Sequence, residues 1–236
     1  EMVLKIANRY KRKVLITSTS EVYGKSTKVP FSEEDDRLLG PTTKSRWSYS
    51  CSKAIDEFLA LAYFKEKGLP VVLVRLFNTV GPRQTGQYGM VVPRFIKQAM
   101  EGRELTVYGD GSQSRCFGFV GDVVGALIKL MNHPQAVGQI FNIGNTQEVT
   151  IMELAKRVLA LTGSASKIKL VPYEEAYEQG FEDMARRVPD LTKIKKLIGY
   201  EPKVDLEGII TRIQEYELAA VKTEKKPAHE LAHLPR

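Results

Sequence analysis

The chain has 236 residues, of which 43% are hydrophobic and 8% aromatic, enough to bury one sizeable core or a core with a small lobe. The net charge is +7, but the basic residues are spread along the chain and their tightest runs contain no interleaved aromatic residues, so we expect no nucleic-acid binding. No apolar run approaches the roughly 18 residues of a membrane span, so we expect neither a membrane anchor nor a signal peptide.

Cysteines and histidines are few and are not spaced as metal ligands. Cys51 and Cys116 form no Cys-x-x-Cys motif, and the three histidines make no zinc-binding pattern. We therefore expect free thiols, no metal site and a cytoplasmic location.

The apolar pattern predicts helices and strands in alternation. Residues 2–7 have the pattern of the end of an amphipathic helix, and the β-branched run 14–16 that of a buried parallel strand. A long helical pattern over 47–67 ends at Gly68 and is followed by a second buried strand at 71–76. These elements together predict one βαβ unit.

The same alternation continues to the end of the chain. Helices are predicted at 93–100, 123–131, 150–161 (opened by the capping box Thr150-x-x-Glu153), 190–198 and 206–221, and strands at 105–108, 116–120, 140–143 and 167–171. The charged residues that follow, with two prolines, predict a disordered tail over 221–236.

This order of elements predicts an α/β fold, namely the carboxy-terminal part of a doubly wound, Rossmann-like parallel sheet with a small substrate-binding α/β lobe. Residues 1–80 are expected to belong to the sheet domain, and residues 81–220 to the lobe, interleaved with late elements of the sheet. A dinucleotide-binding fold begins with a strand, a glycine-rich turn and a helix. The glycines in 81–89 and 109–111 lie in polar loops and do not form such a turn.

Tyr49 and Lys53 are the first candidate for chemistry. They lie four residues apart at the start of a predicted helix and therefore on one face. A nearby cation favours the phenolate and makes a tyrosine a usable base, although the same pair is also common on solvated helix faces. The hydroxyl-rich segment 17–21 follows the 14–16 strand at its carboxyl end, where open α/β sheets place their ligands, unless these hydroxyls only satisfy loop backbone.

Four motifs occur in a fixed order along the chain. They are Thr19-Ser20-Glu21-Val22-Tyr23-Gly24, Tyr49-x-x-x-Lys53, Arg75-Leu76-Phe77-Asn78-Thr79-Val80-Gly81-Pro82-Arg83, and Val107-Tyr108-Gly109-Asp110-Gly111-Ser112-Gln113-Ser114-Arg115. In order and spacing they resemble the extended short-chain dehydrogenase/reductases, the NAD-dependent epimerase/dehydratase family that acts on nucleotide sugars. The resemblance extends from the first residues to about Tyr216.

This resemblance implies a role for each matching residue. Tyr49 would be the catalytic base, Lys53 would lower its pKa and hold the nicotinamide ribose, and Thr19 would hydrogen-bond the reacting hydroxyl. The tyrosinate would take the proton of the sugar 4-hydroxyl while hydride passes to NAD, which gives a 4-keto sugar. The nucleotide diphosphate would be held by Asn78, Arg83 and Arg115, although each arginine is also compatible with an ordinary surface position.

Two residues bear on the type of reaction. Ser20 stands where the 4,6-dehydratases of this family have an aspartate, which disfavours dehydration. Thr-Ser-Glu resembles instead the UDP-glucuronate decarboxylases, and Arg187 falls where those enzymes have an arginine near the sugar carboxylate. Glu21 and Arg187 would then organise the acid-base and carboxylate contacts, with UDP-xylose as product. A UDP-sugar 4-epimerase is the alternative, and a non-catalytic nucleotide-sugar-binding remnant is the alternative from another class.

The resemblance also implies three βα steps before the first strand of this chain, roughly 90 residues at about 30 residues each. Without them we expect the chain alone neither to hold NAD well nor to turn over, and we expect the strand at 14–18 to present an unpaired edge. Relatives pair through the helix that contains Tyr49 and Lys53, so a homodimer is expected for the complete protein.

Overall fold

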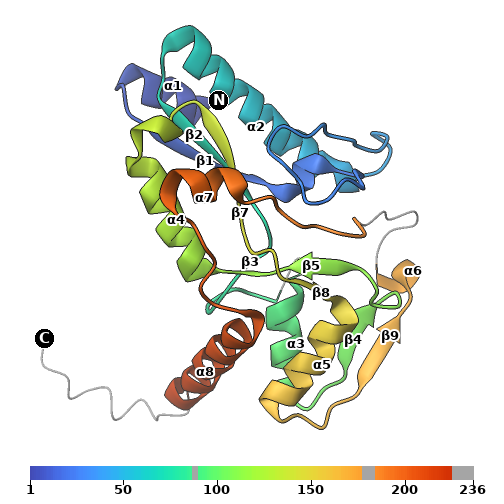
Figure 1. Cartoon of the computed structure of the whole chain (residues 1–236). Helices are drawn as coiled ribbons and strands as arrows, with labels where there is room; N and C mark the ends of the chain where they lie inside the picture. The colour runs from blue at the N-terminus through green and yellow to red at the C-terminus, as the bar shows by residue number, and fades with distance from the viewer. Residues whose placement is uncertain (87–89, 177–183, 225–236) are drawn as a thin grey trace, which may run out of the picture.

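The computed structural model describes residues 1–86, 90–176 and 184–224. Its main sheet has three parallel strands in the order β1-β2-β7, with β1 at Val14–Thr19, β2 at Val71–Leu76 and β7 at Gln139–Ile143. Helices α1 (Met2–Arg9) and α2 (Arg46–Lys67) cover one face, and α4 (Val120–Asn132) and α7 (Thr192–Ile198) cover the other (Figure 1). This is the predicted α/β architecture with a parallel sheet, and the fold class is confirmed.

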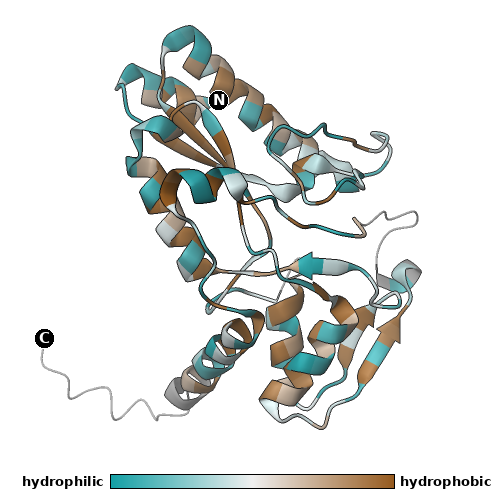
Figure 2. Ribbon diagram, viewed as in Figure 1, coloured by the Kyte–Doolittle hydropathy of each residue, from teal (hydrophilic) through white to brown (hydrophobic). Residues whose placement is uncertain are grey.

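Strand β2 shows why the sheet is covered on both faces. Val71 and Leu73 pack with the α1 and α2 cluster, whereas Val72 and Val74 pack with the α4 and α7 cluster. Successive side chains point to opposite faces of a strand, so an uninterrupted run of apolar residues requires helices on both sides. Figure 2 shows the hydrophobic residues concentrated in these strands between the two helix layers.

The second lobe has its own core. Helices α3 (Val91–Met100), α5 (Ile151–Thr162) and α8 (Leu206–Glu224) pack with the parallel pair β4 (Leu105–Tyr108) and β9 (Ile168–Val171). Smaller elements are η1 (Ser20–Tyr23), η2 (Pro134–Ala136), α6 (Tyr173–Ala176), the parallel pair β3 (Thr79–Val80) and β6 (Gly118–Phe119), and the antiparallel pair β5 (Ser114–Cys116) and β8 (Glu148–Thr150). The short pairs lie where the lobe meets the sheet domain (Figure 1).

Several predicted boundaries were wrong. The predicted strand at 116–120 is divided between β5 and β6, because each half pairs with a different partner strand. Helix α7 begins at Thr192 instead of residue 190, since the Asp190 carboxylate accepts a hydrogen bond from the Thr192 N–H (2.8 Å). Helix α8 continues to Glu224, past the predicted end at residue 221, and the rest of the predicted tail lies outside the described residues.

In the described ranges, no helix combines the length and apolarity needed to cross a bilayer. A search of the same residues finds no group of three or more His, Cys, Asp or Glu side chains that could hold a metal ion. Cys51 is exposed and Cys116 is buried, and both are free thiols.

Candidate functional site

The carboxyl end of β1 is the centre of the candidate site. Ser18, Thr19 and Ser20 are all buried there, and the chain continues from Thr19 into the short 3-10 helix η1. Thr19 caps this turn: its Oγ1 accepts a hydrogen bond from the backbone N–H of Glu21 (3.3 Å). The cap fixes the direction of the backbone from the end of β1 to Glu21.

Helix α2 holds this end of β1 with a row of polar side chains. The Ser50 hydroxyl donates to the Glu21 carbonyl oxygen (2.7 Å), and Lys53 Nζ donates to the Thr17 carbonyl oxygen (3.0 Å). Glu57, one turn further along, accepts a short hydrogen bond from the Ser18 hydroxyl. Residues at this spacing share one helix face, so a single stripe of α2 fixes three successive parts of the strand end.

Tyr49 lies in the first turn of the same helix and is 49% exposed. It adjoins Ser50, whose hydroxyl is fixed on Glu21, and lies one turn before Lys53, whose side chain is mostly covered. The predicted pair is therefore placed at the strand end with its ammonium anchored on β1 and its phenol-bearing residue accessible. A ligand can therefore reach the phenol that is predicted to act as the base.

A buried polar network lies beneath this site. The Arg75 guanidinium makes two hydrogen bonds to the Glu57 carboxylate (3.0 and 2.8 Å) and donates to the Tyr23 hydroxyl (2.9 Å), which in turn donates to Asn142 Oδ1 (2.8 Å). Burial raises the pKa of Tyr23 to about 12, against the opposing effect of Arg75. Tyr23 therefore stays protonated at neutral pH and has a structural part in the network.

Glu21 lies between two arginines. Arg187 Nη1 is 3.3 Å from Glu21 Oε1, and Arg46 forms a closer ion pair with Oε2 of the same carboxylate. All three side chains are at most 16% exposed, so water screens these contacts weakly. Arg46 was missed by the sequence analysis. Its position three residues before Tyr49, on the same helix face, was the available signal.

Two of the three residues predicted to hold the diphosphate lie close together. Asn78 Nδ2 donates to the Cys116 carbonyl oxygen (3.1 Å), and the buried Arg115 donates to the carbonyl oxygens of Ser114 (2.8 Å) and Ala185 (3.4 Å). Both therefore lie where β5 meets the sheet domain. Arg83 is exposed with a φ of 70° and makes no hydrogen bond or ion pair to other described residues.

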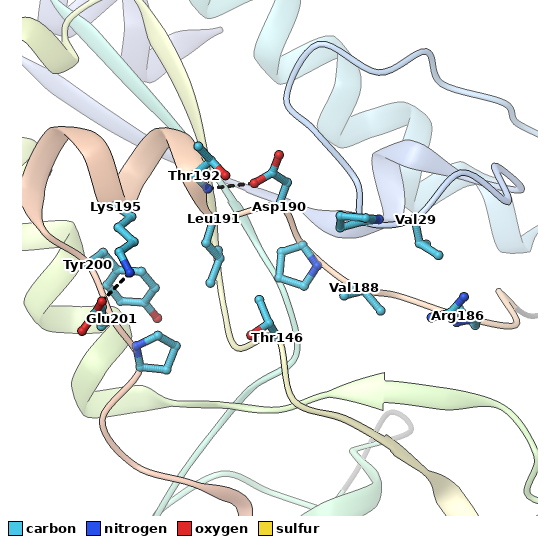
Figure 3. Close-up of a pocket in the computed structure, with 13 residues that line it drawn as sticks. Val29, Thr146, Arg186, Val188, Asp190, Leu191, Thr192, Lys195, Tyr200 and Glu201 are labelled. Atoms are coloured by element: carbon cyan, nitrogen blue, oxygen red, sulfur yellow. Dashed lines mark hydrogen bonds and ion pairs between the residues drawn. The ribbon is translucent and has the colours of Figure 1, made fainter.

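A cavity of about 460 Å³ lies beside the segment 186–192, between the loop at Val29 and helix α7 (Figure 3). Its polar lining includes Arg186 and Asp190, and Lys195 there is paired with Glu201 (2.5 Å). None of the eight predicted site residues lines this cavity. The candidate site is therefore the strand end with Thr19, Glu21, Tyr49, Lys53 and Arg187, and not this cavity.

The residues at the strand end fit one half of NAD. Lys53 and Tyr49 lie at the carboxyl ends of parallel strands, where open α/β sheets receive nucleotide cofactors, and the Lys53 ammonium suits a ribose hydroxyl. The pyrophosphate half of NAD requires a glycine-rich turn between a buried strand and a helix. The parts of the chain described above contain no such turn.

The chain is similar to several known proteins. Residues 1–213 match the family model described as GDP-mannose 4,6 dehydratase. A UDP-N-acetyl-alpha-D-glucosaminuronate decarboxylase from Bacillus cytotoxicus is 49% identical, over 90% of this chain and 66% of its own length. The UDP-glucuronic acid decarboxylase 1 of Xenopus tropicalis is 39% identical, over 91% of this chain and 49% of its own length. The chain thus spans between about half and two thirds of these relatives.

One similar solved structure was determined with NAD bound. The dTDP-glucose 4,6-dehydratase from Bacillus anthracis, in complex with NAD, superposes with a TM-score of 0.80 at 28% identity, over 93% of this chain and 66% of that one. The fold and these matches place the chain in the Rossmann-like class of the epimerase/dehydratase proteins. More particularly, the chain belongs to the GDP-mannose 4,6-dehydratase family.

Proposed function

We propose that this protein catalyses the NAD-dependent decarboxylation of a UDP-linked hexuronate, with UDP-glucuronate converted to UDP-xylose. The observation on which the proposal rests is the cluster of Arg46, Glu21 and Arg187 beside Thr19. Two guanidinium groups in a poorly solvated position suit a second carboxylate, that of the substrate. A UDP-sugar without a carboxylate would add no second carboxylate beside Glu21.

Each residue would have its own role in the reaction. Tyr49 accepts the proton of the 4-hydroxyl, with Thr19 hydrogen-bonded to the same oxygen and Lys53 favouring the phenolate. When bound, NAD supplies a hydride acceptor at C4 and later returns the hydride. The resulting 4-keto uronate is a β-keto acid: its C5–C6 bond breaks, carbon dioxide leaves, and the electron pair passes to the keto oxygen. A water hydrogen-bonded to the Glu21 carboxylate then gives a proton to C5, while Arg187 orients the substrate carboxylate before it leaves as carbon dioxide.

The substituent at C2 distinguishes two candidate substrates. The 49% identity to the Bacillus cytotoxicus decarboxylase favours testing the 2-acetamido hexuronate beside UDP-glucuronate. The reaction at C4 to C6 is the same for both, so the predicted residues keep their roles. Specificity of this kind depends on the shape of the pocket around C2.

The direct test is product analysis of the protein expressed from its complete coding sequence, supplied with NAD and either UDP-hexuronate. We expect carbon dioxide and a UDP-pentose. A 4-epimer that retains its carboxylate would indicate the epimerase alternative. Substrate binding without any product would indicate a binding remnant.

Tyr49→Phe separates chemistry from binding in the same assay. Only the phenolic oxygen is lost, so turnover should fall by about a hundredfold or more while UDP affinity stays the same. Tyr216→Phe is the matched control, because Tyr216 is exposed on α8, and this variant should keep full activity. Retention of activity by Tyr49→Phe would contradict the assignment of the base.

We further propose a cytoplasmic homodimer that pairs through α2. Ile55 and Phe58 on α2 are 57% and 61% exposed, and Met2, Val3 and Ile6 on the adjoining α1 are also exposed. Exposed apolar residues gathered on neighbouring helices favour an interface. Light scattering of the protein and of Phe58→Asp tests this, because the variant should be monomeric.

A further inference from the structure

Residues 185–190, which we call the crossing segment, run between the two lobes (Figure 1). At one end, the Ala185 carbonyl oxygen accepts a hydrogen bond from the Ser114 N–H of β5 (3.0 Å). At the other end, the Val188 carbonyl oxygen accepts from the Phe31 N–H (2.8 Å), and the Asp190 N–H donates to the Phe31 carbonyl oxygen (2.8 Å). The segment is therefore fixed to the lobe before Arg187 and to the sheet domain after it.

Two consecutive arginines on this segment reach opposite lobes. Arg187 pairs with Glu21 at the end of β1, as described above. Arg186 forms a two-pronged pair with Glu148 on β8, with Nε to Oε1 and Nη2 to Oε2 both at 2.8 Å. Glu148 also accepts a hydrogen bond from the Ser114 hydroxyl, so the Arg186 contact is part of the β5-β8 pair.

We propose that Arg186 and Glu148 form a positioning pair that sets Arg187 for the substrate carboxylate and so contributes to the selection of hexuronates. This inference rests on the proposed function, because it takes Arg187 as the carboxylate ligand. Arg186 touches neither the reacting atoms nor Glu21 by any contact in the described chain. It acts through its neighbour.

The geometry gives the physical reason. Guanidinium and carboxylate forks that meet at two points fix orientation as well as distance. The pair of Arg186 with Glu148 on β8 adds to the two hydrogen bonds at the Ala185 carbonyl oxygen in fixing the backbone before Arg187, so the Arg187 side chain keeps its direction toward Glu21. The Arg186 side chain is 56% exposed, so its loss should lower overall stability only modestly and leave the protein folded. Its larger effect should appear in ligand selection.

The test is calorimetric titration of the NAD-loaded full-length protein in a Tyr49→Phe background, which blocks turnover, with UDP-glucuronate and with UDP-glucose, which lacks the carboxylate. We expect Arg186→Gln to weaken UDP-glucuronate binding by about tenfold, the scale expected for a misplaced binding group, and to leave UDP-glucose affinity unchanged. Arg186→Lys should recover part of the loss. Arg103→Gln is the matched control, because Arg103 is also 56% exposed and paired with a glutamate, yet lies on the surface beyond α3.

A double-mutant cycle shows whether Arg186 acts through Arg187. In an Arg187→Gln background, Arg186→Gln should cause no further loss of UDP-glucuronate affinity. Equal losses for both ligands, additive losses in the cycle, or an unchanged preference in Arg186→Gln would each overturn the positioning role while the proposed function stands. A wild-type protein without preference for UDP-glucuronate over UDP-glucose would overturn the carboxylate role of Arg187, and the proposed function with it.

Discussion

At the residue scale, the ion pair of Glu57 and Arg75 is the contact on which the site most depends. Each residue is only 5% exposed, and Glu57 also holds the Ser18 hydroxyl next to Thr19. Glu57→Gln removes one charge and leaves the Arg75 guanidinium buried without a counter-charge. Breaking a buried pair in this way costs about 3–5 kcal/mol, and urea unfolding should show a loss of this size.

Glu153→Gln, which breaks the more exposed pair with Arg157, should cost less than about 1 kcal/mol. Similar losses for both variants would contradict the argument.

Glu148 gives a prediction for acid stability. Its hydrogen bonds from Arg186, and then from Ser114, lower the pKa of its carboxyl to about 2, against a smaller opposing effect of burial. A group whose pKa is lower in the folded state contributes stability above its unfolded pKa, near 4.5, and that contribution is lost as the pH falls toward about 2. Arg186→Gln removes the largest cause. The urea midpoint of this variant should therefore fall less than that of the wild type between pH 5.5 and about 3.5, and equal falls would refute the assignment.

At the element scale, the turn that ends η1 depends on one glycine. Gly24 has φ 63° and ψ −131°, and a Cβ there would lie 2.1 Å from the Leu38 carbonyl oxygen. Gly24→Ala should therefore displace the loop at Leu38 and destabilise the protein by more than 2 kcal/mol, since steric overlap adds to the ~1–2 kcal/mol cost of a positive φ. Gly68 is the control: its φ is 65°, but no atom lies within 4 Å of the added Cβ. Thermal melts should place Gly68→Ala between the wild type and Gly24→Ala.

The elements also show which parts of the fold a sequence can predict. Strands β1, β2 and β7 were predicted because a continuous apolar run is typical of a strand covered on both faces. The division between β5 and β6 was not predicted, because it depends on pairing with β8 and β3, which are remote in the sequence. Local apolar pattern contains no information about such partners.

The candidate site shows the same limit. Glu21 and Arg187 were predicted from motifs to act together, and they are in contact although 166 positions separate them. The second partner of Glu21, Arg46, belongs to none of the predicted motifs. The two opposed arginines of the crossing segment likewise become visible only when both lobes are in place. Side-chain direction along an extended segment decides which carboxylate each arginine meets, and sequence spacing alone does not give the partner.

At the scale of the whole molecule, the proposed diphosphate contacts lie where the two lobes meet. Asn78 follows β2 of the main sheet, and Arg115 on β5 contacts the crossing segment at Ala185. A ligand that binds here touches both lobes only when they are folded against each other. Because such a ligand binds the folded state alone, it should raise the stability of the chain by RT ln(1 + [L]/Kd).

UDP should therefore shift the thermal melt of the 236-residue chain upward in a single transition. At a hundredfold excess over Kd the stabilisation is about 2.7 kcal/mol, which corresponds to roughly 5–10 °C for a domain of this size. Uridine should give a much smaller shift, since it lacks the diphosphate that the arginine and amide groups would hold. Equal shifts with uridine and UDP would place recognition on the nucleoside alone. A melting temperature that is unchanged at every UDP concentration would mean that the two lobes of this chain do not form the diphosphate site together. The diphosphate contacts assigned to Asn78 and Arg115 would then be wrong.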